Sequence, residues 1–380
     1  MKIKNIPLSR PSITEKEIKQ VTEVLMSGHL TTGLKVTEFE ENMSNYLGKG
    51  IYSAGLNSCT AGLYLSLLAC GVGEGDEVIV PTWTFAATAH VVYWTGAKPV
   101  LCDVKEDSLN LDETLLERLV TPKTKVIIPV HFAGFPCEMD SIMTLARNHN
   151  LYVIEDAAHA IGTKYKGKNI GAIGDATVFS FYATKNLACG EGGMVVSKNK
   201  KLIQQVKKTL YFGINKEAYK KHEGKGRWFY DIESMGYKFN LDNIHAAIGL
   251  SQLEKLDPMN ERRRYIAHLY KDGLDKRIVL PKDSKEHLHS YHLFYIRVDK
   301  SIISRDELAL KLQEKNIGSS VHFIPLHKHS FYQKRFSKQQ FPVADRIHDE
   351  VLSIPMFPDM SNEDVAYVIE NINGILRKAL

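Results

Sequence analysis

A lysine follows an apolar run in the middle of this sequence. The run ATVFSFY, residues 176–182, is typical of a buried strand, and two residues separate it from Lys185. No acidic residue follows before Glu191, which lies in a glycine-rich turn. A lysine in a partly desolvated pocket has a lowered pKa and can form a Schiff base with an aldehyde. Taken alone, Lys185 is interpreted more simply as a solvated loop residue.

Two other segments place polar groups at the ends of predicted elements. Asp156 ends the strand-like segment NLYVIEDA, where a buried carboxylate needs a partner, although it would serve equally well as a helix cap. Asn57, Ser58 and Thr60 precede an apolar helix, whose free amides could bind a phosphate. Ordinary helix capping explains these three residues equally well.

Together, the lysine, the aspartate and the helix N-terminus match the needs of pyridoxal phosphate. Its aldehyde takes a lysine, its protonated ring nitrogen takes a carboxylate, and its phosphate takes a helix N-terminus. An aromatic residue is also expected to stack on the ring. Trp83 follows the strand EVIVP, and Pro81 with the neighbouring threonines predicts that it lies at the strand end. The alternative is that Trp83 is a core residue.

The elements that position these residues alternate between apolar strands and amphipathic helices from about residue 35 to residue 250. Several strands are almost continuously apolar, as is typical of a parallel sheet covered by helices on both faces. This pattern predicts an α/β fold, in which ligands bind beyond the carboxyl ends of the strands. The predicted strands span residues 76–81, 97–104, 124–132, 150–157, 176–182 and 192–197.

The C-terminal part of the chain has a different texture. A long helix or a kinked pair of helices is expected over residues 245–274, followed by strands at SYHLFYIRV and SSVHFIPLH with a helix between them and a closing helix. We therefore expect a large α/β domain over residues 1–255 and a smaller α+β domain over residues 256–380. The N-terminal helix, TEKEIKQVTEVLMSG, is a possible addition to the smaller domain.

Composition excludes several classes of protein. The chain has 380 residues, of which 44% are hydrophobic and 24% charged, with a net charge of +5. This charge is too mild to predict binding to nucleic acid, and no apolar run is long enough to span a membrane. The N-terminus lacks the apolar core of a signal peptide, and the five scattered cysteines are typical of reduced thiols, so we expect a cytoplasmic protein.

Three further patterns carry weaker predictions. Gly71, Gly73 and Gly75 precede a strand, whereas a dinucleotide-binding loop must follow one, so we interpret them as a turn. The histidines of VHFIPLHKH have no accompanying carboxylates or cysteines, so no metal site is expected. Lys225 and Arg227 lie in a basic segment that is either a solvated loop or a closure over a diphosphate.

The chain resembles the DegT/DnrJ/EryC1/StrS family of pyridoxal-phosphate-dependent sugar aminotransferases over essentially its whole length. The resemblance rests on these segments: SGHLTTG, NSCTAGLYLSLLA, GDEVIVPTWTFAATA, PVHFAG, VIEDAAHAIGTKYKGKNIGAIGDATVFSFYATKNLACGEGG, GYKFNLDNIHAAIGLSQL, YHLFYIRV and VHFIPLH. It implies the aspartate-aminotransferase (type I) fold, with a mostly parallel seven-stranded sheet. It also implies a homodimer with active sites at the subunit interface.

The resemblance also implies residue roles. Lys185 is expected to bind the cofactor covalently and to shuttle protons, Asp156 to pair with the ring nitrogen, and Trp83 to stack on the ring. His159 is expected beside the 3-oxygen, and His322 near the substrate. The phosphate is expected to bind to Ser180, Cys59 and Thr60.

One motif departs from the pattern that many relatives share. Those relatives read GYNYRM where this chain reads GYKFNL, residues 236–241. The first Asn of that motif reaches the phosphate of the neighbouring subunit's cofactor, and here Lys238 stands in its place, with Asn240 two residues further on. Period-two spacing places both residues on one face if the segment is extended. Which of them makes the contact is left open.

The resemblance implies transfer of an amino group from L-glutamate to a nucleotide-linked keto sugar. A UDP- or dTDP-linked 4-keto-6-deoxyhexose is favoured, for surface polysaccharide synthesis. A UDP-4-keto-pentose and an inositol-like ketone are alternative acceptors. Family dehydratases carry His at the lysine position, so Lys185 argues against that reaction. A non-enzymatic regulator would be expected to have lost one of the cofactor-binding residues, and this chain retains them.

Overall fold

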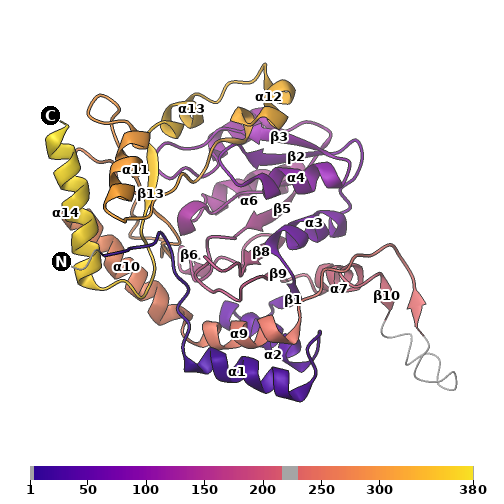
Figure 1. Ribbon diagram of the computed structural model, residues 1–380. Helices are drawn as coiled ribbons and strands as arrows, with labels where there is room; N and C mark the ends of the chain where they lie inside the picture. Colours follow the sequence, from indigo (N-terminus) through magenta and orange to yellow (C-terminus); the bar gives the residue numbers. More distant parts are fainter. Residues whose placement is uncertain (1–3, 216–229, 380) are drawn as a thin grey trace.

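The computed structural model describes residues 4–215 and 230–379, and its centre is a seven-stranded sheet (Figure 1). The strand order is β1-β9-β8-β5-β4-β2-β3, and β9 alone runs opposite to the others. The mostly parallel sheet is therefore confirmed, although the apolar runs did not predict β1. The strands are β1 (Tyr52–Leu56), β2 (Glu77–Pro81), β3 (Lys98–Cys102), β4 (Thr124–Ile127), β5 (Tyr152–Asp156), β8 (Ala176–Ser180) and β9 (Gly193–Ser197).

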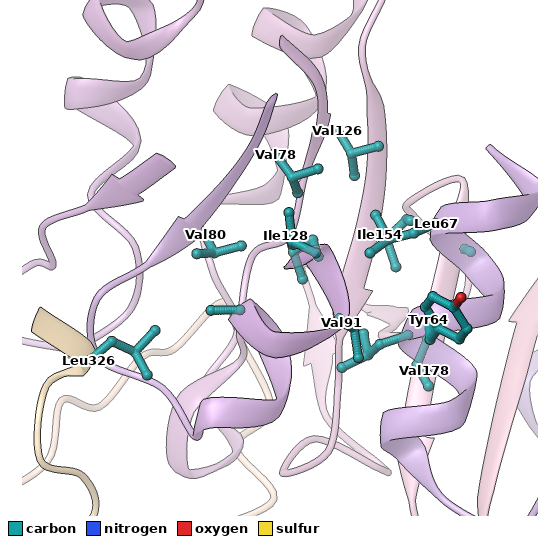
Figure 2. Close-up of a cluster of buried hydrophobic side chains, with 14 of the residues drawn as sticks. Tyr64, Leu67, Val78, Val80, Val91, Val126, Ile128, Ile154, Val178 and Leu326 are labelled. Atoms are coloured by element: carbon teal, nitrogen blue, oxygen red, sulfur yellow. The ribbon is translucent and has the colours of Figure 1, made fainter. Parts of the chain in front are cut away.

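Helices cover both faces of the sheet because successive strand residues point to opposite sides. Val78 and Val80 pack with Tyr64 and Val91 in one core cluster, shown in Figure 2, whereas Ile79 belongs to a cluster on the other face. The first cluster lies under α3 (Cys59–Ala69), α4 (Ala86–Trp94) and α7 (Lys200–Thr209). The second lies under α2 (Leu34–Leu47), α6 (Met139–His149) and α9 (Asn243–Glu254). Short helices η1 (Glu113–Leu115), α5 (Leu116–Leu119) and η2 (Phe132–Gly134) join the strands.

A third core cluster forms around a two-stranded antiparallel sheet near the C-terminus. It contains β12 (Phe294–Arg297), β13 (Val351–Ile354), α10 (Leu256–Gly273), α11 (Arg305–Glu314) and α14 (Asn362–Lys378). Helices α9 and α10 are the kinked pair expected from the sequence. Helix α10 starts in the second cluster, at Leu256, and enters the third by Ile266. It therefore connects the body built on the seven-stranded sheet to the C-terminal body, which is built around the third cluster.

The strand predicted at SSVHFIPLH is wrong. This segment makes one isolated bridge, between Ser320 and Ser353, and then turns into η3 (Leu326–Lys328). Pro325 cannot donate a backbone hydrogen bond, and the N–H of Leu326 donates to Thr82 O, beyond the end of β2. The partner of β12 is β13, and α12 (Ser330–Phe336) and α13 (Pro342–His348) lie between η3 and β13.

The N-terminal segment and the N-terminal helix pack on different bodies. Helix α1 (Glu15–Ser27) packs against α9, not on the C-terminal body that the sequence suggested. The extended segment before it does reach that body, where Ile6 joins the third cluster and Leu8 O accepts a hydrogen bond from the N–H of Met356. Two small sheets complete the described chain: β6 (Lys164–Tyr165) with β7 (Lys168–Asn169), and β10 (Ile214–Asn215) with β11 (Asp231–Ile232). Among the described residues, no helix is both long and apolar enough to cross a membrane.

Candidate active site

A cavity of about 510 Å³ lies at the carboxyl edge of the sheet, where β5 and β8 end and α3 begins. Leu293, Ile354 and Met356, from the C-terminal part of the chain, also line it. Most of the expected site residues, which are far apart in sequence, meet here: the lining includes Cys59, Thr60, Asp156, His159, Ser180, Lys185 and His322.

Lys185 stands on a tight turn after β8. Its N–H donates to Tyr182 O at 2.8 Å, and the N–H of Cys189 donates to Phe181 O at 2.8 Å. Burial lowers the pKa of Lys185 to about 8, because the charged form loses its hydration. Among residues 4–215 and 230–379, no carboxylate lies within ion-pair distance of its ammonium group. Close to neutral pH, the buried amine is therefore present in part as the free base.

Asp156 is the last residue of β5 and faces the same side of the sheet as Ile154. The Thr88 hydroxyl donates to its Oδ2 at 2.8 Å, and the Ala158 N–H donates to its Oδ1 at 3.2 Å. Burial raises the pKa of Asp156, although these hydrogen bonds and the nearby Lys185 oppose the rise. The carboxylate is thus held in one orientation at the cavity wall.

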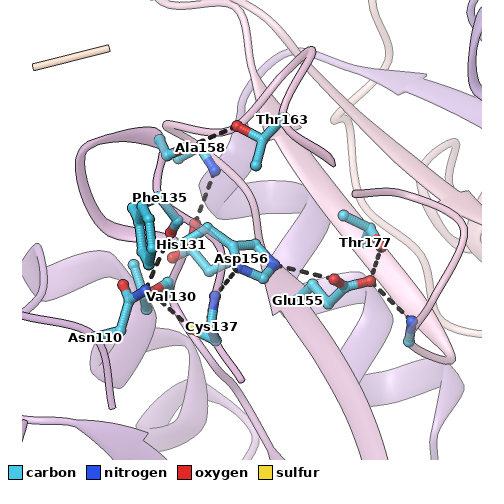
Figure 3. A network of polar contacts seen from close by, with 12 residues as sticks. Asn110, Val130, His131, Phe135, Cys137, Glu155, Asp156, Ala158, Thr163 and Thr177 are labelled. Atoms are coloured by element: carbon cyan, nitrogen blue, oxygen red, sulfur yellow. Dashed lines mark hydrogen bonds and ion pairs between the residues drawn. The ribbon is translucent and has the colours of Figure 1, made fainter. Parts of the chain in front are cut away.

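The neighbouring Glu155 points to the opposite face and anchors the strand (Figure 3). Its Oε1 accepts hydrogen bonds from Gly174 N at 2.8 Å and from the Thr177 hydroxyl at 2.6 Å. His131 Nδ1 accepts from Cys137 N at 3.0 Å, so His131 Nε2 carries the proton that it donates to Glu155 Oε2, also at 3.0 Å. This network, in which Glu155, His131 and Thr177 are buried, fixes the end of β5 behind Asp156.

The start of α3 forms a potential phosphate cradle. Ser58 caps the helix by accepting from Ala61 N at 3.1 Å, and the amides of Cys59 and Thr60 lie in the first turn, where a helix supplies no acceptor of its own. Ser180 lines the cavity beside them. A side chain at Gly193 would place its Cβ 2.5 Å from Cys59 N, so β9 touches the helix start.

Trp83 does not lie in the cavity, and the expectation that it sits at an accessible strand end is wrong. Its side chain is 0% exposed, belongs to the core, and donates through Nε1 to His322 O at 3.2 Å. The chain bends after Pro81, so Trp83 points inward. Phe85, two residues later and 63% exposed, lines the cavity. Phe85 directly precedes the helix α4, and this position was the signal in the sequence that could have identified it as a cavity residue.

Three imidazoles line the cavity around the lysine. His159 and His322 were expected, whereas His292 was missed, and its ring centroid lies 4.3 Å from that of His159. Burial lowers the pKa of His322 to about 4 and those of His159 and His292 well below the usual value. The three rings are therefore neutral at physiological pH and place no second positive charge beside Lys185.

Lys238 and Asn240 lie on one face of their segment, as the spacing predicted. Lys238 Nζ donates to Asn240 Oδ1 at 2.5 Å, and Asn240 Nδ2 donates to Thr32 Oγ1 at 2.6 Å. Neither residue lines the cavity of its own chain. Lys225 and Arg227 lie outside the described residues.

The histidines near residue 325 have protein partners. His322 Nδ1 bonds to Ser353 Oγ, His327 lies between Thr82 and Asp345, and His329 bonds to a backbone carbonyl oxygen. Within the described ranges, no group of three or more His, Cys, Asp or Glu side chains is arranged to hold a metal ion.

The donor set fits pyridoxal phosphate. One cavity presents a buried amine of lowered pKa for an aldehyde, a buried carboxylate for a ring nitrogen, and a capped helix N-terminus with a hydroxyl for a phosphate. Gly193 lets β9 approach this helix start more closely than any other residue type would.

Comparison with known proteins agrees with this fit. Residues 11–373 match the DegT/DnrJ/EryC1/StrS aminotransferase family. The spore coat polysaccharide biosynthesis protein SpsC of Bacillus subtilis is 44% identical over 381 residues, covering 98% of each chain. The uncharacterized protein MJ1066 of Methanocaldococcus jannaschii is 44% identical over 377 residues, covering 98% of this chain and 97% of its own.

Solved structures extend the comparison to the fold. The putative sugar aminotransferase Spr1654 from Streptococcus pneumoniae, in its PMP-form, superposes with a TM-score of 0.92 at 34% identity, covering 99% of this chain and 100% of its own. Its PLP-form gives a TM-score of 0.91. Helicobacter pylori PseC, an aminotransferase involved in the biosynthesis of pseudoaminic acid, gives 0.91 at 28% identity, with coverages of 99% and 100%. This chain belongs to the DegT/DnrJ/EryC1/StrS aminotransferase family and is a pyridoxal-phosphate-dependent sugar aminotransferase of fold type I.

Proposed function

We propose that this enzyme moves the amino group of L-glutamate to a keto sugar attached to a nucleotide, yielding 2-oxoglutarate and an amino sugar. One observation carries the proposal: a single cavity holds the buried amine of Lys185, the carboxylate of Asp156 and the start of α3, and its lining also includes apolar residues. The similarity to SpsC, a spore coat polysaccharide biosynthesis protein, supports a role in the synthesis of a surface glycan.

The residues divide the chemistry among them. When bound, pyridoxal phosphate supplies an aldehyde that accepts nitrogen and a ring that accepts electrons. Nζ of Lys185 removes the α-proton of the donor and later delivers a proton to the sugar carbon that receives the nitrogen. With the cofactor bound, Asp156 would hold the proton at the ring nitrogen, and His159 would interact with the 3-oxygen. Phe85, in place of Trp83, would supply the aromatic contact with the ring.

The phosphate and the subunit contacts complete the proposed site. Ser180 and the amides of Cys59 and Thr60 would hold the phosphate. The enzyme works as a homodimer, in which Lys238 or Asn240 reaches the phosphate site of the neighbouring subunit. We place it in the cytoplasm, where its five free cysteines would remain reduced.

Apolar residues in the cavity lining, namely Leu8, Leu293, Ile354 and Met356, favour a deoxy sugar. A 6-methyl group would be buried against these residues at lower cost than a hydroxymethyl group, which would need a hydrogen-bonding partner. We therefore favour a UDP- or dTDP-linked 4-keto-6-deoxyhexose, with His322 as a candidate substrate contact. A UDP-4-keto-pentose or an inositol-like ketone has no methyl group to use this wall, which is formed by Leu8, Leu293, Ile354 and Met356.

The visible spectrum of the purified enzyme tests the donor reaction. The enzyme with pyridoxal phosphate is expected to be yellow, and L-glutamate is expected to bleach the band. Lys185→Ala should lose the lysine-linked band, whereas the exposed Lys201→Ala should retain it. A panel of keto sugars that restores the band would then identify the acceptor.

Each outcome bears on a different part of the proposal. A band that glutamate does not bleach, while another amino acid does, would overturn glutamate as the donor. Restoration by free keto sugars or by an inositol-like ketone, and not by nucleotide-linked sugars, would overturn the proposed acceptor. Equal rates with 6-deoxy and 6-hydroxy sugars would contradict the role of the apolar wall.

A further inference from the structure

The side chain next to the lysine points away from the cavity edge into a buried polar network. Asn186 follows Lys185 directly, and its side chain is buried. Its Nδ2 donates to Asn260 Oδ1 at 2.7 Å and to Ser290 O at 2.9 Å, and its Oδ1 meets His292 Nδ1 at 3.1 Å. One side chain on the lysine turn thus makes three hydrogen bonds to segments 74 or more residues away.

Two backbone carbonyl oxygens fix the direction of every hydrogen bond in this network. Asn260 Nδ2 donates to Ile161 O at 3.1 Å, so Asn260 turns its Oδ1 toward Asn186. Asn186 Nδ2 donates to Ser290 O, so Asn186 turns its Oδ1 toward His292. Carbonyl oxygens accept and never donate, and therefore His292 Nδ1 must carry the proton. The unprotonated Nε2 of His292 has no hydrogen-bonding partner within residues 4–215 and 230–379.

The other ends of the network are also anchored. Asn260 lies on α10, the helix that runs from the second core into the third. His292 precedes β12, and the buried Arg263 donates to the carbonyl oxygens of His292 and Met356. The lysine turn is therefore attached both to the connecting helix and to the C-terminal body.

We propose that Asn186, Asn260 and His292 position Lys185, holding its turn against the C-terminal body. This inference rests on the proposed role of Lys185. Backbone hydrogen bonds hold the turn at Lys185 and at Cys189. Between these two residues, the side chain of Asn186 attaches the turn to Asn260, Ser290 and His292. Since His292 is neutral, it holds the turn without placing a positive charge near the amine. His292 and Asn186 are positioning residues that act through the turn.

Attachment of the cofactor to the apoenzyme tests the network independently of turnover. The lysine nitrogen joins the aldehyde carbon with loss of water, and borohydride then supplies the hydride that makes the bond permanent for mass analysis. The rate of attachment is measured against pH, which reports the pKa of Lys185. The wild-type midpoint is expected near 8.

Three variants give matched comparisons. His292→Leu removes the hydrogen bond, so the turn loosens, water reaches the amine and the midpoint rises by about one unit, which slows attachment at pH 7 about tenfold. His292→Asn retains a donor in the Nδ1 position and is expected to stay within about twofold of wild type. His289→Leu removes another buried imidazole, with no bond to Asn186, and is expected to leave the midpoint unchanged.

The outcomes separate this inference from the proposed function. If wild type attaches no cofactor at Lys185, the proposed function fails. If wild type does attach it and His292→Leu has the same midpoint and rate, only the positioning network is overturned. Loss of function in His292→Asn equal to that in His292→Leu would also overturn it. If His292→Leu does not fold, Asn186→Ala is expected to show the same shift, and an unshifted midpoint there contradicts the network.

Discussion

At the scale of single residues, burial shifts the pKa values of the ionisable groups in the site. Burial lowers the pKa of Lys185 to about 8, so the free-base fraction rises as pH increases through 8. Burial raises the pKa of Asp156, but two hydrogen bonds favour its ionised form. A ligand with a protonated ring nitrogen would favour that form further, because it places a positive charge beside the carboxylate.

Replacing Asp156 tests its role at the ring nitrogen. Asp156→Ala is expected to leave binding of pyridoxal phosphate partly intact and to lower turnover by about 10²–10³-fold, since the charge that stabilises the electron-rich ring is lost. Half-reaction rates with glutamate in a stopped-flow spectrometer would measure this effect. Asp140→Ala, on the exposed surface of α6, is the control and should match wild type. Near-normal turnover of Asp156→Ala would refute the assignment.

At the scale of elements, β9 and α3 lie in close contact at the proposed phosphate site. Gly193→Ala would place a Cβ 2.5 Å from Cys59 N, which is below any ordinary contact distance, so the helix start must shift. We expect the Kd for pyridoxal phosphate to rise about tenfold, a loss of about 1.4 kcal/mol. Gly73→Ala is the matched control, since nothing lies within 4 Å of its Cβ. Fluorescence titration measures the Kd of both variants. Equal Kd values for Gly193→Ala and Gly73→Ala would show that the contact does not shape the phosphate cradle.

The anchor of β5 is expected to matter for stability. Glu155→Ala leaves His131, Thr177 and Gly174 without their buried acceptor, and we expect a loss of about 3–5 kcal/mol in the free energy of unfolding. Urea denaturation measures this loss. Glu117→Ala removes a carboxylate that bonds to His149 at the surface, and it should cost less than about 1 kcal/mol. Similar losses in the two variants would contradict a structural role for the buried network.

At the scale of the whole molecule, large apolar side chains on α1, α2 and the segment between them remain exposed. Met26 is 84% exposed and Leu34 is 87% exposed. Exposed apolar patches of this kind favour association. Asn240, near them, bonds to Thr32 and faces away from its own cavity, as a residue that serves a second subunit would.

A charge on this surface tests the proposed homodimer. Leu34→Glu is expected to shift the enzyme toward monomer and to lower activity at least tenfold, because a buried carboxylate at the interface is costly and the neighbouring phosphate contact is lost. Sedimentation velocity measures the mass of the wild-type enzyme and of each variant. Leu310→Glu, at a residue that is 62% exposed on α11, should change neither property. A wild-type enzyme that sediments as a monomer would contradict the homodimer.

The sequence by itself was enough to predict the parallel sheet. It was also enough to predict that Lys185, Asp156 and the start of α3 lie at the ends of its elements. These features follow from local patterns: apolar runs define strands, polar residues mark their ends, and the carboxyl ends of parallel strands share an edge. The resemblance added the cofactor and the family, and both are confirmed.

Only the tertiary structure decided which side chains face the cavity. A bend after β2 turns Trp83 into the core and leaves Phe85 at the wall, and no periodicity extends across such a bend. The bond between Asn186 and His292 joins residues 106 positions apart, so no local pattern predicts it. Backbone periodicity is set by neighbouring residues, whereas side-chain direction at strand ends is set by packing between distant segments, which forms only when the chain folds.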